Sequence, residues 1–281
     1  MTETSEKKSA LRVVVHSFFV VPFLIAAFAV LVFFMWRLLT NEPRSVEDYL
    51  ADVKVGSATK RWQSAYDLSR ILADPARIPD DGRFVSQMLS AFDYSLRDPD
   101  WRVRQYLIRA MGQSGLEAFS PAIRGLLNDE NETIVADAVY SLGLIGSDDN
   151  LEPLKSLADH NSSLVRNRVA IALGNLGSGE AVGTLCIMLR DMEPNVYWNA
   201  AVSLAKLGDG SGREVLLNLL DRTYLAKFEG LDGYEHREAM LVAIRAAELL
   251  DDSLLNAAIR RLSEDDQDMR VRNAAIQALR S

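Results

Sequence analysis

The sequence predicts an all-α protein: a right-handed α-solenoid of stacked helix pairs, preceded by a single transmembrane helix. Two observations carry this prediction. An apolar pattern recurs in steps of 31 residues, beginning at Val103, Ile134, Val165 and Val196. A stretch without charged side chains lies near the N-terminus, over residues 13–36. Because one helix pair cannot bury its own apolar face, recurring pairs must stack on their neighbours.

The charge-free stretch is the first element in chain order. Roughly 20 apolar helical residues span the hydrocarbon core of a bilayer, and Trp36 with Arg37 is typical of a membrane interface. We therefore expect an N-terminal tail over residues 1–12 and a membrane-spanning helix over residues 13–37. A cleaved signal peptide and a buried core helix are the alternatives. Signal peptides have shorter apolar regions and a small-residue cleavage site, so a single-pass anchor is favoured.

The orientation of this anchor follows from the basic residues beside it. Lys7, Lys8 and Arg12 precede the stretch, whereas Arg37 and Arg44 follow it closely. The positive-inside rule then slightly favours a cytoplasmic N-terminus and an exported solenoid, in a bacterial cytoplasmic membrane. Residues 38–56 are polar and mixed in charge, which predicts a juxtamembrane linker with a short helix around residues 46–53.

Each copy of the repeat carries a second helix with apolar residues at positions 0, +4, +8 and +11. In one copy these residues are Val165, Val169, Leu173 and Leu176, and they share one helical face. Glycine or alanine at +9 predicts a close approach by a neighbouring helix. With a degenerate early copy over residues 60–68 and further copies after Val196, we expect about seven repeats over residues 57–281.

A first helix precedes each of these second helices and is separated from it by turn residues. Asp98 before Pro99 is typical of a helix start, because a carboxylate can accept from a first-turn amide and proline lacks that donor. The sixth repeat is longer than the others, and its excess lies within residues 222–234. This segment is either a partner-docking loop or a first helix lengthened through Phe228, whose aromatic residues cover the neighbouring repeat.

The segment Val165–Gly174 (VRNRVAIALG) resembles the HEAT repeat, and more narrowly the short HEAT-like repeats of the phycobilin-lyase type. The helix of that type reads Val-Arg-x-x-Ala-Ala-x-Ala-Leu-Gly. The resemblance covers roughly residues 57–281 and implies the fold but little about function, because the motif consists of packing residues. It also implies a ladder between repeats, built from the recurring residues Arg104, Arg166, Arg272, Asp98, Asp129, Asp191 and Asp266. Copies at Val135, Tyr197 and Ala239 lack the arginine, which predicts an interrupted ladder.

Composition excludes several classes of function. The net charge is −8, which argues against nucleic acid as the main partner. The single cysteine, Cys186, excludes an internal disulfide and a thiolate-rich metal site, and the three histidines are scattered. Paired carboxylates fall in the turns between helices. We therefore expect no catalytic residues, no cofactor, no metal and no small-molecule substrate, and we expect that the protein is not an enzyme.

The remaining function is a membrane-anchored protein–protein interaction scaffold or assembly factor, whose partner is a protein in a membrane complex. A non-catalytic accessory subunit of a membrane enzyme or transporter is the alternative, followed by a chromophore lyase-like enzyme. Side chains at +2 and +3 of the second helices and aromatic residues of the insertion are the candidate contacts. The expected partner-binding residues are Tyr106, Arg168, Trp198, Tyr224, Phe228 and Tyr234. Tryptophan and arginine are common at binding hot spots, although Trp198 could instead pack between helices.

Overall fold

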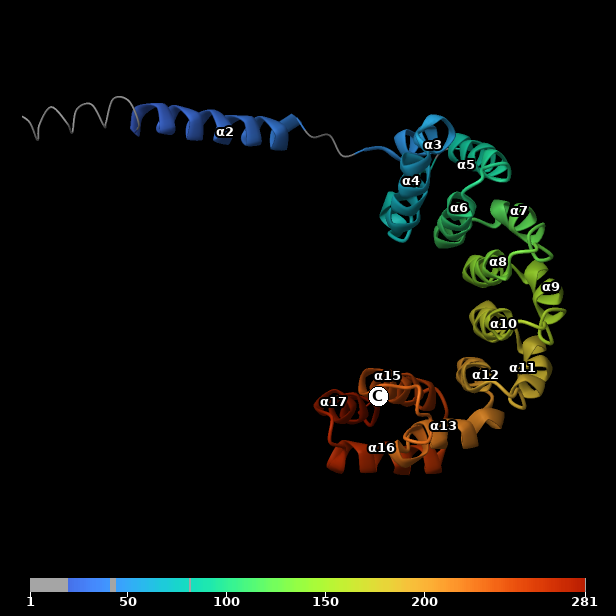
Figure 1. Ribbon diagram of the computed structural model, residues 1–281. Helices are drawn as coiled ribbons and strands as arrows, with labels where there is room; N and C mark the ends of the chain where they lie inside the picture. Colours follow the sequence, from blue (N-terminus) through green and yellow to red (C-terminus); the bar gives the residue numbers. More distant parts are fainter. Residues whose placement is uncertain (1–19, 41–43, 81, 281) are drawn as a thin grey trace, which may run out of the picture. The chain divides into compact units, whose positions relative to one another are not determined.

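The computed structural model describes residues 20–40, 44–80 and 82–280 (Figure 1). The chain divides into two compact units, Met1–Ser45 and Val46–Ser281. No described residue lies in a β-strand. The prediction of an all-helical repeat solenoid is confirmed for the second unit.

The first unit contains, in its described part, the helix α2 (Val21–Thr40). Its large apolar side chains are exposed, with Phe23 at 72% and Trp36 at 68% of their accessible surface. The predicted tail over residues 1–12 and the first residues of the predicted anchor, 13–19, lie outside the described residues. No helix in the described part is long and apolar enough to cross a membrane. The membrane-spanning helix expected over residues 13–37 is therefore not supported.

The second unit consists of helix pairs that follow one another along the chain (Figure 1). The first helices of the pairs are α3 (Val46–Val55), α5 (Gly82–Ser95), α7 (Ser120–Arg124), α9 (Leu151–Lys155), α11 (Val182–Met188), α13 (Arg213–Leu219) and α16 (Ser253–Asp265). The second helices are α4 (Ala58–Ile71), α6 (Trp101–Ser114), α8 (Glu132–Ile145), α10 (Ser163–Leu176), α12 (Pro194–Lys206), α15 (Gly233–Ala247) and α17 (Met269–Ala278). A further short helix, α14 (Arg222–Leu225), lies between α13 and α15.

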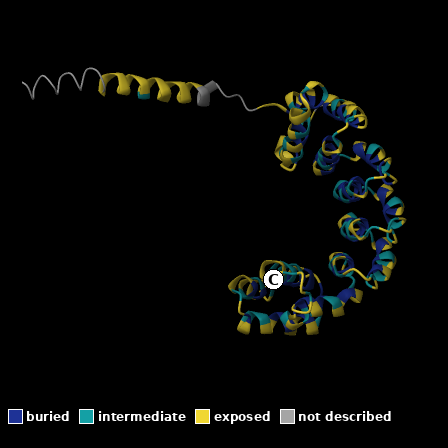
Figure 2. Ribbon diagram, viewed as in Figure 1, coloured by how far each residue is buried: buried dark blue, intermediate teal, exposed yellow. Residues whose placement is uncertain are grey.

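Short 3-10 helices complete the connections between these elements. They are η2 (Pro75–Arg77), η3 (Glu117–Phe119), η4 (Asp148–Asn150), η5 (Gly179–Ala181) and η6 (Gly210–Gly212). Helices α6, α8, α10 and α12 stack in order along the inner side of the unit, while α7, α9 and α11 form its outer side (Figure 1). Buried residues concentrate between the two layers (Figure 2).

The expected juxtamembrane linker, residues 38–56, belongs to the solenoid from Val46 onward, where residues 46–55 form the helix α3. Val46, Leu50 and Val53 are buried on one face of α3 and join the same hydrophobic core as the following helices. Their spacing of four and three residues places them on one helical stripe. The compact unit therefore begins at Val46, and α3 with α4 forms its first helix pair.

Successive second helices touch at the glycines of position +9. A Cβ added to Gly112 would lie 2.5 Å from Ser141, and one added to Gly174 would lie 2.3 Å from Ser203. Gly143 has the same relation to Ala172, at 2.6 Å. Real Cβ atoms do not approach other heavy atoms this closely, so these positions require glycine. The close approach expected from the sequence is confirmed.

The close approach also permits hydrogen bonds from one helix to the next. The Ser141 hydroxyl donates to the carbonyl of Ile108 at 3.1 Å, and the Ser203 hydroxyl donates to the carbonyl of Ala170 at 2.8 Å. Both serines are buried. A buried hydroxyl without a partner would cost free energy. A shift of one helix along the next would break these hydrogen bonds, so each glycine–serine pair favours one alignment of the two helices.

The sixth copy has a different register from the one suggested by its sequence. The sequence pattern of the sixth copy places Glu238 and Val242 at positions 0 and +4. The buried positions of α15 are instead Met240, Ala243, Ile244, Ala246 and Ala247. Met240 therefore takes position +4 and Ile244 takes position +8. The alanine-rich sequence around them offers no unique apolar spacing, which explains the shift.

These contacts generate a matched pair of glycine substitutions. Gly174→Ala should destabilise the protein by about 1–3 kcal/mol, because overpacking forces the backbone of α10 away from Ser203. Gly183→Ala, in the exposed part of α11 with no atom within 4 Å of the new Cβ, should stabilise by up to about 1 kcal/mol. Urea unfolding of both variants measures the difference; equal effects would contradict the packing.

Candidate interaction surface

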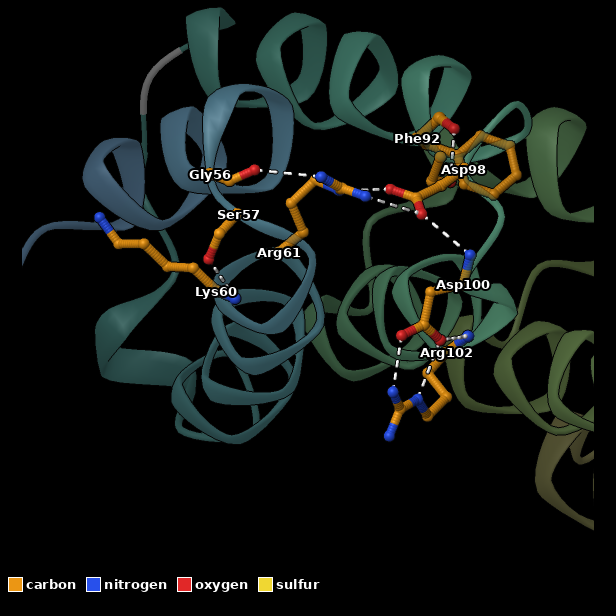
Figure 3. Close-up of polar contacts among 9 residues, drawn as sticks. Gly56, Ser57, Lys60, Arg61, Phe92, Asp98, Asp100 and Arg102 are labelled. Carbon is orange, nitrogen blue, oxygen red and sulfur yellow. Dashed lines mark hydrogen bonds and ion pairs between the residues drawn. The ribbon is translucent and has the colours of Figure 1, made fainter.

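Arginine–aspartate ion pairs connect successive repeats along one edge of the solenoid. In each pair an arginine of one repeat binds an aspartate of the following repeat. Four such pairs are Arg61–Asp98 at 2.6 Å, Arg104–Asp129 at 3.0 Å, Arg166–Asp191 at 2.7 Å and Arg222–Asp266 at 2.7 Å. Figure 3 shows the first pair, in which Nε and Nη2 of Arg61 donate to the two Asp98 carboxylate oxygens, while Nη1 donates to the carbonyl of Gly56.

Each aspartate of this ladder also shapes the turn before its own helix. Asp98 accepts from the backbone N–H of Asp100 at 2.9 Å, and Asp191 accepts from that of Glu193 at 2.9 Å. The residue that caps α6 is Asp100, which accepts from the N–H of Arg102. The expectation that Asp98 is itself the helix cap was therefore wrong by two residues, because its carboxylate is turned towards Arg61.

One carboxylate of the ladder, that of Asp191, is held in its charged form. The hydrogen bond from Arg166 lowers the pKa of Asp191 below its usual range, against the opposing effect of burial. Asp191 in turn raises the pKa of Arg166. Both side chains are largely buried, with 16% and 10% of their surfaces exposed. A charge-assisted bidentate pair of this kind is strong and geometrically specific.

The ladder is interrupted where the sequence lacks the arginine, as expected at Val135. The ladder position of the following repeat holds His160 instead of an aspartate. The Nδ1 of His160 accepts from the N–H of Ser162 at 3.1 Å, so the turn before α10 keeps its hydrogen bond. This junction therefore rests on helix packing, and the described residues form no arginine–aspartate ladder pair across it.

The ladder is also interrupted at Tyr197, where the second helix has no arginine. Residues of the insertion form the contacts between repeats at this point. The hydroxyls of Tyr197 and Tyr224 lie 2.9 Å apart, and burial followed by the Tyr224 hydrogen bond raises the pKa of Tyr197. Two residues earlier on α14, Arg222 binds Asp266 through two hydrogen bonds of 2.7 Å. The short helix α14 thus links the repeat before it to the repeat after it.

The aromatic residues of the insertion pack against Trp198. The Trp198 ring lies 5.0 Å from Phe228 in an edge-to-face contact, and its Nε1–H donates to the Tyr224 hydroxyl at 3.4 Å. Trp198 is only 8% exposed. The insertion is therefore neither an open loop nor a lengthened first helix, although its rings do cover the neighbouring repeat.

Tyr234 is the member of the predicted set that faces solvent near the insertion. It is 58% exposed and lies beneath the guanidinium of Arg237, whose carbon is 5.0 Å from the ring centroid. It follows Asp232, which forms a capping box with Glu235 at the start of α15. Trp198, Tyr224 and Phe228 thus form one cluster, and Tyr234 stands apart from it.

Aromatic and arginine side chains alternate along the inner face of the first four second helices. Arg102 lies over Trp62 at 4.7 Å, and Arg168 lies over Tyr140 at 5.1 Å. Tyr66 and Tyr106 meet edge to face at 5.2 Å. We call this set the aromatic–arginine strip: Trp62, Tyr66, Arg102, Tyr106, Tyr140 and Arg168.

The strip contains two of the predicted contact residues, Tyr106 and Arg168, and four residues that were not predicted from the sequence. Tyr66 and Tyr140 stand at position +6 of their copies, one turn beyond the positions +2 and +3 of the predicted contacts. Because +2, +6 and +10 also share one helical face, the spacing of tyrosines in the sequence was a signal that could have found them.

The described part of the chain contains few groups of side chains that could form a catalytic centre. No group of three or more His, Cys, Asp or Glu side chains there is arranged to hold a metal ion. Cys186 is half-buried in α11. Three hollows lie beside the ladder, and their charged groups include the pairs Arg61–Asp98, Arg166–Asp191 and Arg222–Asp266.

The ladder generates a prediction with a pH dependence. Asp191→Asn should lower the free energy of unfolding at pH 7 by about 1–3 kcal/mol, the contribution of a hydrogen bond to a charged group. Because the pKa of Asp191 is lowered in the folded state, this contribution is present above about pH 4 and disappears as the pH falls through the folded pKa. Urea unfolding at several pH values should therefore show that the difference in unfolding free energy between Asp191→Asn and the unsubstituted protein becomes smaller below pH 4.

The exposed Asp251 provides the control for this series. Asp251→Asn should stay within about 0.5 kcal/mol of the unsubstituted protein at pH 7. If Asp191→Asn has the same unfolding free energy as the unsubstituted protein at pH 7, or if the difference grows in acid, the proposed role of the ladder is contradicted.

The insertion generates a second prediction. Replacing residues 222–233 by a short Gly-Ser turn removes the partners of Asp266, Tyr197 and Trp198 together with the cap of α15. We expect the last two helix pairs to unfold, seen as lost helical circular dichroism and as proteolysis confined to the C-terminal part. Tyr234→Ala should leave both unchanged. A shortened protein that melts normally would show that the insertion is structurally dispensable.

Comparison with known proteins fits this architecture. A family model described as HEAT repeats matches residues 91–174 and 154–226, and no curated protein matches the chain. A chain from the complex of CpcE and CpcF of phycocyanin lyase from Nostoc sp. PCC7120 is 20% identical with a TM-score of 0.56, over 85% of this chain and 97% of that chain. Escherichia coli YibA is 17% identical with a TM-score of 0.50, over 83% and 92% of the two chains. These likenesses concern the fold alone, and with the family match they show that the chain carries HEAT-like repeats.

Proposed function

We propose that the protein is a non-enzymatic scaffold or assembly factor that binds a protein partner through the inner face of its second helices. The aromatic–arginine strip is the observation that carries this proposal. Tyrosine, tryptophan and arginine are enriched where proteins bind one another. Here they line one continuous surface, which a stack of repeats makes long enough for an extended partner.

The stacked pairs also provide a rigid base for such a surface. Glycine contacts between α6, α8 and α10 fix the spacing of the helices that carry Tyr106, Tyr140 and Arg168. Side chains on closely packed helices lose less freedom on binding than side chains on loops. The solved Nostoc chain with this fold comes from a complex of two proteins, which supports protein binding by analogy of fold.

The finer part of the proposal is that the scaffold acts at a membrane complex. Its support is the sequence alone: residues 13–36 contain no charged side chain. Attachment would raise the effective concentration of the solenoid near membrane partners. Extraction of the full chain from membranes by detergent, but not by high salt or alkaline carbonate, is the expected result. Release by salt or carbonate would contradict an anchor. Reporter fusions at the C-terminus test the exported orientation of the solenoid.

A scaffold and an accessory subunit differ in stoichiometry. An accessory subunit would co-purify in a fixed ratio with one complex after mild detergent extraction, whereas a scaffold or assembly factor would be recovered in variable, substoichiometric amounts. A chromophore bound to the purified protein would instead support a lyase-like enzyme and contradict the proposal.

Site-specific photo-cross-linking in the producing cells tests the binding surface. A photoreactive phenylalanine at Tyr106 or Tyr140 replaces one aromatic ring by another and should capture the same protein at both positions. The matched control is Tyr94, which is 45% exposed on the first helix α5. Capture at Tyr94 alone, or of different proteins at Tyr106 and Tyr140, would contradict binding through the inner face.

A further inference from the structure

The inner face of the first four repeats differs in charge from the rest of the solenoid. The chain holds 31 basic and 39 acidic residues. Subtracting four basic and two acidic residues in positions 1–40 leaves 27 and 37 for the remainder. On and beside the strip the balance reverses, because four arginines stand there with three neighbouring carboxylates. The arginines are Arg70, Arg102, Arg109 and Arg168, and the carboxylates belong to Asp67, Asp100 and Asp137. A local excess of positive charge on an acidic protein selects partners of negative charge.

Two of these four arginines are already neutralised within the chain. Asp100 binds Arg102 at 2.7 Å, and the buried Asp137 binds Arg109 at 3.0 Å. The guanidinium groups of Arg70 and Arg168 contact no carboxylate in the described part of the chain. Arg70 lies over the ring of Tyr66 at 5.9 Å, and Arg168 lies over Tyr140.

Arg168 also has unused hydrogen-bonding capacity. Its Nε is buried and has no hydrogen-bond partner, although a buried donor without a partner is costly. The Arg168 guanidinium carbon lies 5.1 Å from the centroid of the Tyr140 ring, and a guanidinium group offers its N–H donors as a planar fork. Such a fork suits the two oxygens of a carboxylate.

The distance between the two free cations sets the size of a ligand that could reach both. Helices α4 and α10 are separated by α6 and α8, and neighbouring packed helices lie about 8–10 Å apart. Three such steps amount to about 30 Å. An extended peptide advances about 3.3 Å per residue, so roughly nine residues bridge the gap. Tyr66, Tyr106 and Tyr140 line the path between the two arginines.

We infer that the strip, together with the neighbouring Arg70, binds an extended acidic segment of the protein partner, with carboxylates at Arg70 and at Arg168 and apolar contacts with the tyrosines between them. This inference rests on the proposed function, since it names the chemistry of the partner at the same surface. The two outer carboxylates stand about nine residues apart, because the helix spacing fixes the distance between their arginines.

Fluorescence anisotropy with defined peptides tests this inference on the full-length protein in detergent. The probe is a fluorescein-labelled peptide with two glutamates, a seven-residue spacer of serine and leucine, and two further glutamates. A peptide with glutamine in place of glutamate, and one whose spacer has two residues, are the controls. We expect the probe to bind at least about fivefold more tightly than either control, with affinity falling as salt is added. Equal binding of all three peptides would overturn the inference.

Arginine substitutions locate the binding. Arg70→Gln and Arg168→Gln should each weaken the probe by about fivefold or more, the loss of one hydrogen-bonded charge pair. Arg260→Gln, on the exposed side of the first helix α16, should leave binding unchanged. Melting curves establish that each variant is folded, and Arg168→Lys provides a second, conservative test that should retain part of the affinity. Equal effects of Arg260→Gln and Arg168→Gln would also overturn the inference.

Two outcomes distinguish binding of an acidic peptide from binding of single-stranded nucleic acid and from the proposed function alone. Arginines with aromatic rings also suit single-stranded nucleic acid, so labelled oligothymidylate is a necessary competitor. Tighter binding of the oligonucleotide than of the acidic peptide would overturn the inference. If photo-cross-linking captures a protein at Tyr106 and Tyr140 while no acidic peptide binds, the proposed function stands and the acidic segment is rejected.

Discussion

The close contact between successive second helices is the constraint on which the rest of the structure depends. At Gly112, Gly143 and Gly174 the neighbouring helix occupies the space that a Cβ would need. This approach brings the Ser141 and Ser203 hydroxyls within reach of the preceding helix backbone. It also sets the spacing at which an arginine can reach the aspartate of a following repeat. Packing, ladder and inner face therefore share one geometric origin.

The hydrophobic core and the ladder make different contributions to the structure: the core stabilises the stack of repeats, and the ladder favours one alignment of neighbouring repeats. The core supplies most of the stabilisation because it removes apolar surface from water, but apolar packing alone tolerates small changes of register. The ion pairs are directional and partly buried, so they favour one alignment of each junction. Where the ladder fails, as at Val135 with His160, the tight contact of Gly143 with Ala172 remains. At Tyr197 the short helix α14 supplies substitutes from the insertion.

The 31-residue period, the apolar face of the regular second helices and the close helix contact at +9 could be predicted from the sequence, because these are local features that recur. The sequence alone did not predict the role of α3, since a single amphipathic stretch of ten residues beside a polar segment resembles a linker. It also missed Arg222 as a ladder residue, because that arginine lies in an irregular segment and its partner is 44 positions away. Within the strip, the stacking of Arg102 on Trp62 joins different repeats and follows only from their packing.

The central claim is that the first four repeats form one rigid surface of fixed span. Double electron–electron resonance between spin labels on Gln63→Cys and Asn175→Cys measures this span directly, with Cys186 replaced by serine. Both labelled positions are exposed, on α4 and α10, and the strip remains intact. Three helix-to-helix steps predict a single narrow distribution centred at about 30 Å. A broad or multimodal distribution would show that the helices do not hold a fixed spacing and would contradict the account.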